Sequence, residues 1–346
     1  MDIKKYNEKG YTGLLNLGNT CFLNSCIQLL NHTYELYKLL DENSLNKYIK
    51  DNNDSIILNE YNELRKIMFN TNGIVSPNRF MHYIQEVSKK KNMEIFSGFN
   101  QNDMPEFLLF IVDCMHNAIS RPATSIISGT PSNKIDKKAL ICYNFLKQVY
   151  EKEYSEIMNL FYGISVCEIQ SMKGEMYVYR PEHFFILDLP IEHDNIYKCL
   201  ESFTNYEILD GDNQYYNEKT KQKETVKKRN IFWSFPEVLI ITLKRFSYDG
   251  SEKNNKMVDF PLTNLDLSKY VEGYRVNNYI YDLYGICNHM GNINRGHYTC
   301  YIKKGECWID INDENICKIN EKNLITPMSY CLFYRKKKTN DNINVR

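Results

Sequence analysis

Hydrophobic side chains recur at helical spacing through the first 160 residues. Apolar residues return every three or four positions over residues 22–30, directly behind a loop rich in glycine and asparagine. A second stripe with this period covers residues 56–68. Both patterns predict helices with one buried face. Residues 121–134 predict a loop, and a charged helical segment is expected at about 136–160.

A further helix is expected at about 103–119, where the sequence also marks the first turn. Asp103 and Glu106 stand three residues apart ahead of an apolar run, and Pro105 lies in the first turn. This start resembles a capping box, in which a side chain accepts a hydrogen bond from a free backbone N–H of the first turn.

The pattern changes to strands from about Gly163. Runs rich in β-branched and aromatic residues predict four strands: 177–179, 184–189, 238–243 and 281–286. The charged run 217–229 predicts a solvated hairpin or loop, and residues 337–346 predict a disordered tail. Helices followed by strands indicate the α+β class.

Composition and charge narrow the class of protein. The 346 residues suffice for one catalytic unit, and 43 basic residues balance 43 acidic ones, which argues against binding to nucleic acid or to a membrane. The chain has no long apolar run and does not start as a signal peptide. The expected location is the cytoplasm, extending to the nucleus, or the host cytoplasm for a viral chain. The 11 cysteines are an odd number, which favours free thiols.

Cys21 stands where the glycine- and asparagine-rich loop ends and the first helix begins. Backbone N–H groups point outward at a helix start and the helix dipole is positive there, so a thiol loses its proton more easily. A thiolate with backbone donors beside it is a nucleophile with part of an oxyanion hole. We therefore predict that Cys21 is a nucleophile.

A partner for Cys21 is predicted near the other end of the chain. His297 follows a glycine and opens an alternating run that predicts a strand over 297–302, and a second strand follows at 306–311. Such a hairpin can place a polar side chain of its second strand beside His297. A cysteine, a distant histidine and an orienting residue form a known nucleophilic constellation.

The motifs around both residues resemble those of the ubiquitin-specific proteases. The run Gly-Leu-Leu-Asn-Leu-Gly-Asn-Thr-Cys-Phe-Leu-Asn over 13–24 is similar to the family's cysteine box, and 288–298 is similar to its histidine box. Three further segments match landmarks of the family in its order: 101–108, 243–246 and 330–334. The resemblance covers roughly residues 10–336.

This resemblance implies a papain-like cysteine protease fold with thumb, palm and fingers subdomains in a single catalytic domain over 1–336. The helical thumb would comprise about 10–160, the β-rich fingers about 161–235 and the palm about 236–336, with strands near 183–191 added to the palm. The active cleft would lie between thumb and palm, and the fingers would cradle the globular part of ubiquitin.

The resemblance also implies roles for single residues. His297 would act as the general base, and Asn16 would donate its side-chain amide to the oxyanion. The family's third catalytic residue corresponds to Asn312, whose amide oxygen can fix the imidazole tautomer. Asp313 stays open as a supporting neighbour or a partial substitute, and Asp310 is a weaker rival on the same strand face.

Five residues are expected at the substrate. Gln101, Asp103 and Glu106 match the family segment that meets the ubiquitin tail, although helix capping explains the two carboxylates equally well. Tyr298 would pack over the passage for the Gly-Gly end of that tail. His289 is expected to be a structural hydrogen-bonding residue rather than a catalytic one.

The chain departs from the family in the fingers. Many members bind structural zinc there through two Cys-x-x-Cys pairs. Here Gln170 stands three residues after Cys167, and residues 215–220 contain no cysteine. We predict no metal and no other cofactor, with the fingers held by packing and strand pairing.

The expected function is that of a thiol-dependent deubiquitinase, which hydrolyses the (iso)peptide bond after the C-terminal Gly-Gly of ubiquitin. Ubiquitin and ubiquitinated proteins are the expected partners of a monomeric enzyme. Three alternatives stay open: a protease for another ubiquitin-like modifier, a catalytically inactive ubiquitin-binding scaffold, and an unrelated papain-like peptidase. The last fits Cys21 and His297 but not the other landmarks.

Overall fold

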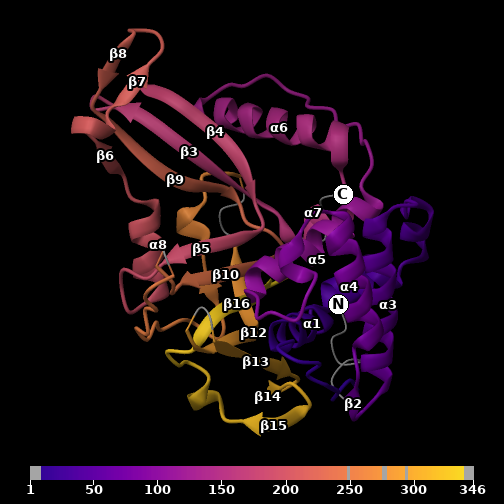
Figure 1. Cartoon of the computed structure of the whole chain (residues 1–346). Helices are drawn as coiled ribbons and strands as arrows, with labels where there is room; N and C mark the ends of the chain where they lie inside the picture. Colours follow the sequence, from indigo (N-terminus) through magenta and orange to yellow (C-terminus); the bar gives the residue numbers. More distant parts are fainter. Residues whose placement is uncertain (1–8, 248–249, 275–278, 293–294, 339–346) are drawn as a thin grey trace.

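The computed structural model of the chain describes residues 9–247, 250–274, 279–292 and 295–338. Helices dominate the first half and strands the second (Figure 1). The predicted tail lies outside the described residues from position 339 onward. Its first residue, Lys337, is held, because its backbone N–H donates to the carbonyl of Ile280 at 2.8 Å.

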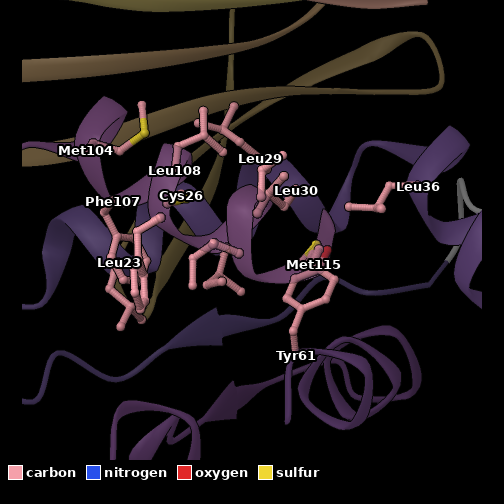
Figure 2. Close-up of a cluster of buried hydrophobic side chains, with 14 of the residues drawn as sticks. Leu23, Cys26, Leu29, Leu30, Leu36, Tyr61, Met104, Phe107, Leu108 and Met115 are labelled. Atoms are coloured by element: carbon pink, nitrogen blue, oxygen red, sulfur yellow. The ribbon is translucent and has the colours of Figure 1, made fainter. Parts of the chain in front are cut away.

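The helical half surrounds one buried helix. Its elements are β1 (Gly13–Leu14), α1 (Cys21–Asn31), α2 (Tyr34–Asp41), η2 (Asn43–Tyr48), α3 (Asn53–Asn70), β2 (Ile74–Val75), α4 (Asn78–Lys90), η3 (Glu94–Phe96), α5 (Met104–Ile119), α6 (Lys134–Glu153) and α7 (Glu156–Phe161). Every residue of α1 is buried. Figure 2 shows leucines of α1, among them Leu23 and Leu29, beside Phe107 and Leu108 of α5. Truncating one such leucine to alanine costs about 2–5 kcal/mol of stability.

The single helix predicted at 136–160 is wrong in one respect, because two helices, α6 and α7, occupy this range. Between them, Tyr154 has an extended backbone and exchanges two backbone hydrogen bonds of 2.9 Å with Arg121. Ser155 then caps α7 by accepting a hydrogen bond from the backbone N–H of Met158. The distant pairing with Arg121 and the local cap together interrupt the helix.

A four-stranded sheet forms the upper left of Figure 1, in the order β4-β3-β9-β6. Its strands are β3 (Gly163–Ser171), β4 (Met176–Phe184), β6 (Glu207–Leu209) and β9 (Val226–Ser234), and at its tip lie η4 (Gly211–Asn213) and the hairpin of β7 (Tyr215–Asn217) and β8 (Gln222–Glu224). The predicted solvated segment 217–229 is therefore too long. Its last residues belong to β9, where Arg229 pairs with Glu168 of β3.

The remaining strands form an eight-stranded sheet in the order β15-β14-β13-β12-β16-β10-β5, with β11 paired to β12. They are β5 (Ile186–Pro190), β10 (Val238–Lys244), β11 (Leu265–Asp266), β12 (Ile280–Gly291), β13 (Gly296–Lys304), β14 (Cys307–Asn312), β15 (Asn315–Ile319) and β16 (Ser329–Lys336), with η5 (Ser268–Tyr270) and η7 (Glu321–Asn323) between them. The strand predicted at 184–189 is split, because β4 ends at Phe184 and β5 joins this second sheet at Ile186.

This large sheet separates two hydrophobic cores. Successive residues of β10 alternate between them, with Ile240 in the core shared with α1 and α5, and Leu239 and Ile241 in the other. The second core also contains side chains of α8 (Ile196–Thr204). The alternation follows from the two faces of a strand, and it leaves α1 against one face of the sheet. No helix in the described part of the chain is both long and apolar enough to cross a bilayer.

Candidate active site

Cys21 is the first residue of α1 and only 3% exposed. The chain turns into the helix through Gly18 and Asn19, which both adopt positive φ angles, of 99° and 56°. Glycine and asparagine tolerate this left-handed conformation best. The carbonyl of Thr20 accepts the first helical hydrogen bond, from Asn24 at 2.9 Å. The backbone N–H of Cys21 therefore belongs to the first turn, which has no partner within the helix.

His297 lies beside Cys21, as predicted from the two motifs. It is the second residue of β13, and α1 packs against this strand. Nε2 of His297 lies 2.7 Å from Oδ1 of Asn312 at the end of β14. Since an amide oxygen only accepts, Nε2 carries a proton, and Nδ1 is the ring nitrogen left for the thiol of Cys21.

The hydrogen bond between the side chains of Cys21 and His297 raises the pKa of His297 to about 9. Partial burial opposes this rise, and the bond to Asn312 and the charge of Asp313 add to it. The imidazole is therefore protonated at neutral pH. An imidazolium beside a thiol at a helix start is the setting in which cysteine nucleophiles occur.

Asn312, rather than Asp313 or Asp310, contacts the histidine. Asp313 turns away because its φ is 50°, a conformation that aspartate and asparagine adopt more readily than most residues. Its carboxylate accepts hydrogen bonds from Asn16 Nδ2 at 2.8 Å and from Asn24 Nδ2 at 2.7 Å. Oδ1 of Asp310 is buried and has no hydrogen-bond partner among the described residues, so it does not bond to His297.

Asn16 is held on both sides of its amide. Its Oδ1 accepts from the backbone N–H groups of Gly18 at 3.0 Å and Thr20 at 3.2 Å, while Nδ2 donates to Asp313. The second N–H of this amide has no partner among the described residues and lies next to the start of α1. Sequence reasoning missed the role of Asn24 as a partner of Asp313. Its place at the end of the cysteine box was the only local signal for that role.

A channel of about 250 Å³ leads to Cys21. Its lining brings together most of the predicted site residues with several others: Cys21, Phe22, Ile95, Gln101, Asn102, Asp103, Glu106, Phe246, His289, Gly296 and Tyr298. The rings of His289 and Tyr298 lie 4.7 Å apart, and both residues are buried. These rings give the channel an aromatic wall.

His289 has a structural partner that sequence reasoning missed. Lys253 Nζ lies 3.0 Å from Nδ1 of His289 and donates to its carbonyl oxygen at 2.7 Å. Burial, the positive charge of Lys253 and that of His297 lower the pKa of His289 to about 4. The ring is therefore neutral at pH 7 and accepts a hydrogen bond rather than exchanging protons with Cys21.

Gln101 and Asp103 form hydrogen bonds to residues of β13 and β16. Nε2 of Gln101 donates to the carbonyl of Gly296 at 2.9 Å. Asp103 caps α5, as predicted, by accepting from the backbone N–H of Glu106 at 3.1 Å. It also accepts from the hydroxyls of Tyr330 at 2.8 Å and Tyr298 at 3.2 Å. Burial raises the pKa of Asp103 in spite of these bonds.

Glu106 differs from Asp103 because its side chain is exposed. Within the described residues, its carboxylate has no ion-pair partner, and it lines both the channel and a larger groove of about 690 Å³ between α5, β5 and β10. Partial burial and the charge of Asp103 raise its pKa. An unpaired carboxylate in a cleft is suited to bind a cation.

The other cysteines differ from Cys21 in their setting. All eleven are free. Burial raises the pKa of the Cys26, Cys287, Cys300 and Cys331 thiols, which lie in the core beneath the site. These thiols stay protonated and unreactive.

No ligand set for a metal is found among the described residues, since no three His, Cys, Asp or Glu side chains lie close enough together. In residues 215–220, where the resemblance implies the second cysteine pair of zinc-binding members, Asn217 donates to the carboxylate of Glu224 of β8 at 3.0 Å, and Thr220 donates to it as well. Tyr177 of β4 donates to the same carboxylate at 2.7 Å. These side chains include no cysteine or histidine and do not form the sulfur and nitrogen ligand set of a structural zinc site.

Solved structures share this fold. The SAGA Ubp8/Sgf11/Sus1/Sgf73 DUB module bound to ubiquitin aldehyde contains a chain that matches 97% of the present one with a TM-score of 0.73 and 23% identity, over 71% of its own length. A variant of the same module bound to monoubiquitin gives the same TM-score, identity and coverage. The predicted α+β, papain-like fold with thumb, palm and fingers is confirmed.

Related sequences agree with this likeness. Ubiquitin carboxyl-terminal hydrolase 2 of Homo sapiens is 30% identical over 347 residues, covering 94% of the chain, and ubiquitin carboxyl-terminal hydrolase Usp2 of Drosophila melanogaster is 32% identical over 339 residues, covering 95%. The chain spans only 55% and 35% of these two relatives. The family model described as ubiquitin carboxyl-terminal hydrolase matches residues 12–334. The chain belongs to the ubiquitin carboxyl-terminal hydrolase family.

Proposed function

We propose that the chain is a thiol-dependent deubiquitinase, which hydrolyses the (iso)peptide bond after the C-terminal Gly-Gly of ubiquitin. The observation that carries this proposal is the contact of Cys21 with His297, and of His297 with Asn312, at the end of a narrow channel. Family membership supports the choice of ubiquitin, as do related structures described as bound to ubiquitin or ubiquitin aldehyde.

In the proposed reaction, Cys21 is a thiolate paired with the imidazolium of His297, and its Sγ attacks the carbonyl carbon of the terminal glycine of ubiquitin. The carbonyl oxygen becomes an oxyanion that accepts hydrogen bonds from the free N–H of the Asn16 amide and from the backbone N–H of Cys21. His297 gives its proton to the departing lysine amine as the C–N bond breaks. Asn312 keeps the ring oriented by accepting from Nε2.

The resulting thioester is then hydrolysed by water. His297, which is neutral after protonating the amine, takes a proton from the water molecule that attacks the thioester carbonyl. The C–S bond breaks and restores the Cys21 thiolate beside the His297 imidazolium, and ubiquitin leaves as a carboxylic acid that loses its proton to solvent.

The channel supports selection for a Gly-Gly end. Tyr298 and His289 form an aromatic wall beside Cys21, and a passage of about 250 Å³ has little room for side chains at the last two positions of a substrate. Among the described residues that line the channel, Glu106 is the exposed carboxylate without an ion-pair partner, and we assign it to an arginine of the ubiquitin tail. Asp103, by contrast, has its acceptors occupied by the protein itself.

Three further features belong to the proposal. The balanced charge of 43 basic and 43 acidic residues favours a protein partner over nucleic acid or a membrane surface. We propose that the enzyme works as a monomer in the cytoplasm, without metal or other cofactor. Hydrogen bonds to Glu224 replace zinc in holding the finger tip.

A ubiquitin probe with an electrophile at its C-terminus tests the proposal. We expect wild type to form a covalent adduct with one ubiquitin, and Cys21→Ala to form none although it is folded. Parallel probes built on other ubiquitin-like modifiers should label far more slowly. Labelling by such a probe but not by ubiquitin would assign a different modifier, and binding of ubiquitin without an adduct would indicate a scaffold.

A further inference from the structure

Gln101 and Gly296 form a two-bond clasp between the thumb and the palm. Nε2 of Gln101 donates to the carbonyl of Gly296 at 2.9 Å, and the backbone N–H of Gly296 donates to Oε1 of Gln101 at 2.8 Å. One amide thus satisfies both polar groups of one backbone residue, as a neighbouring strand would. The two residues are 195 positions apart in the chain.

The clasp acts on the residue directly before His297. Gly296 is the first residue of β13 and pairs with Gly291 at the end of the ladder between β12 and β13. A Cβ atom at Gly296 would lie 2.0 Å from Nε2 of His289. The backbone of Gly296 is therefore held between the His289 ring and the Gln101 amide. Without Gln101, Gly296 would lose two hydrogen bonds, and this last residue pair of the ladder would separate more easily.

The segment that carries Gln101 is itself tied to the loop before Cys21. Asn19 Nδ2 donates to the carbonyl of Phe99 at 3.0 Å. Gln85 of α4 donates to the carbonyl of Gly98 at 3.2 Å, which anchors the segment to the thumb. Residues 98–101 therefore connect the loop of Cys21 with the strand of His297.

We infer that Gln101 is a positioning residue, which sets His297 against Cys21 by holding the backbone of Gly296. This assignment rests on the proposed function and adds to it, since the resemblance implied contact of Gln101 with the substrate. The clasp uses the acceptor and one donor of the Gln101 amide. A role in positioning and a role in substrate binding make different predictions for the enzyme without substrate.

The test is the rate at which iodoacetamide alkylates Cys21 as a function of pH, with no ubiquitin present. Mass spectrometry of the peptide that carries Cys21 separates this reaction from that of the exposed Cys307 and Cys317. In Gln101→Ala we expect the rate near neutral pH to fall on the order of 10-fold, as for the loss of one or two hydrogen bonds. The rise of the rate with pH should also move to higher pH, because Cys21 loses the positive charge of His297 that favours its reactive, deprotonated form.

Gln148→Ala is the matched control, since Gln148 is exposed on α6, which contributes no described residue to the channel. It should alkylate as wild type does. Gln101→Glu keeps the acceptor for the N–H of Gly296 and should lose less than Gln101→Ala, which covers the case that Gln101→Ala does not fold.

Alkylation of Gln101→Ala or Gln101→Glu with the rate and pH profile of wild type would overturn the inference. A raised KM for a ubiquitin substrate at unchanged kcat would then assign Gln101 to substrate binding. Failure of the proposed function is visible separately, because wild type would alkylate rapidly and yet hydrolyse no ubiquitin substrate.

Discussion

At the scale of single residues, the site depends on two asparagines that orient reacting groups without carrying charge. Asn312 accepts from Nε2 of His297 at 2.7 Å, and Asn16 is fixed between Asp313 and the loop of Cys21. An aspartate beside His297 would attract its proton more strongly. The amide of Asn312 orients the ring without adding a negative charge beside His297.

Asn312 should therefore influence the pH above which kcat/KM falls. Since the pKa of His297 is raised to about 9 by Cys21 and then by Asn312, the imidazolium persists below that pH and is lost above it. Asn312→Ala removes one of the contacts that raise the pKa, so the fall in kcat/KM should move to lower pH. Asn312→Asp adds a negative charge and should move it to higher pH. Profiles that coincide with that of wild type in both variants would contradict this role.

Asp313 should act through Asn16. Asn16→Ala removes a donor to the oxyanion and should lower kcat on the order of 10²- to 10³-fold. In Asp313→Asn the new residue tolerates the φ of 50°, but it has one oxygen instead of the two that accept from Asn16 and Asn24. We therefore expect a smaller loss of kcat than in Asn16→Ala, and a loss of stability of about 1–3 kcal/mol.

A double-mutant cycle separates this indirect role from an independent one. In the Asn16→Ala background, Asp313→Asn should change kcat little at pH 7, because its route to the oxyanion is already gone and His297 stays protonated at this pH without the charge of Asp313. Losses of kcat that multiply in the double variant would show that Asp313 contributes to catalysis on its own.

At the scale of elements, α6 is fastened to the finger sheet by one buried carboxylate. Glu168 of β3 is 2% exposed and bonds to Arg229 of β9, to Lys138 of α6 at 3.3 Å and to Tyr206 at 3.0 Å. Burial favours the neutral form, yet the bond from Arg229 and the charge of Lys138 hold its pKa below the usual range. Glu272 bridges the same two cations.

Glu168→Gln should destabilise the fold markedly. Breaking a buried ion pair costs about 3–5 kcal/mol, and the lower end is expected because Glu272 still compensates both cations. Glu182→Gln is the control, since Glu182 pairs with Arg180 on the exposed face of β4 and such pairs contribute about 0–1 kcal/mol. Urea unfolding measures the loss of stability in each of the two variants. Equal effects of the two changes would refute the structural role of Glu168.

The finger tip should need no metal. Tyr177, Asn217 and Thr220 share the carboxylate of Glu224, so a chelator should leave the melting temperature and the activity unchanged. Glu224→Ala should instead make the hairpin of β7 and β8 more sensitive to proteolysis, because its shared acceptor is lost. One zinc ion per chain by elemental analysis would show that this prediction is wrong.

At the scale of the whole molecule, the sequence was informative where local patterns carry the site. Cys21 lies at a helix start and His297 on a hairpin, and both features are visible from spacing and turn residues alone. The choice of Asn312 over Asp313 and Asp310 came instead from the resemblance to the family, because the hairpin alone left all three residues open. The expectations for Cys21 and His297 needed only elements a few residues long.

Features that depend on distant approach could not be predicted. The helix predicted at 136–160 is interrupted because Tyr154 pairs with Arg121, and no local signal marks that pairing. Phe184 and Ile186 continue one alternating pattern although they belong to different sheets. Lys253 reaches His289 from another loop. In each case a tertiary contact overrides or adds to the local preference.

We propose that Cys21, activated by His297, hydrolyses the bond after the C-terminus of ubiquitin. The most direct test of this proposal is turnover of ubiquitin carrying a C-terminal fluorophore, measured for wild type beside Cys21→Ala under identical conditions. We expect steady release of fluorophore by wild type and none by the folded Cys21→Ala protein. Release that persists in Cys21→Ala, or no release by folded wild type, would show that the proposed nucleophile or the proposed activity is wrong.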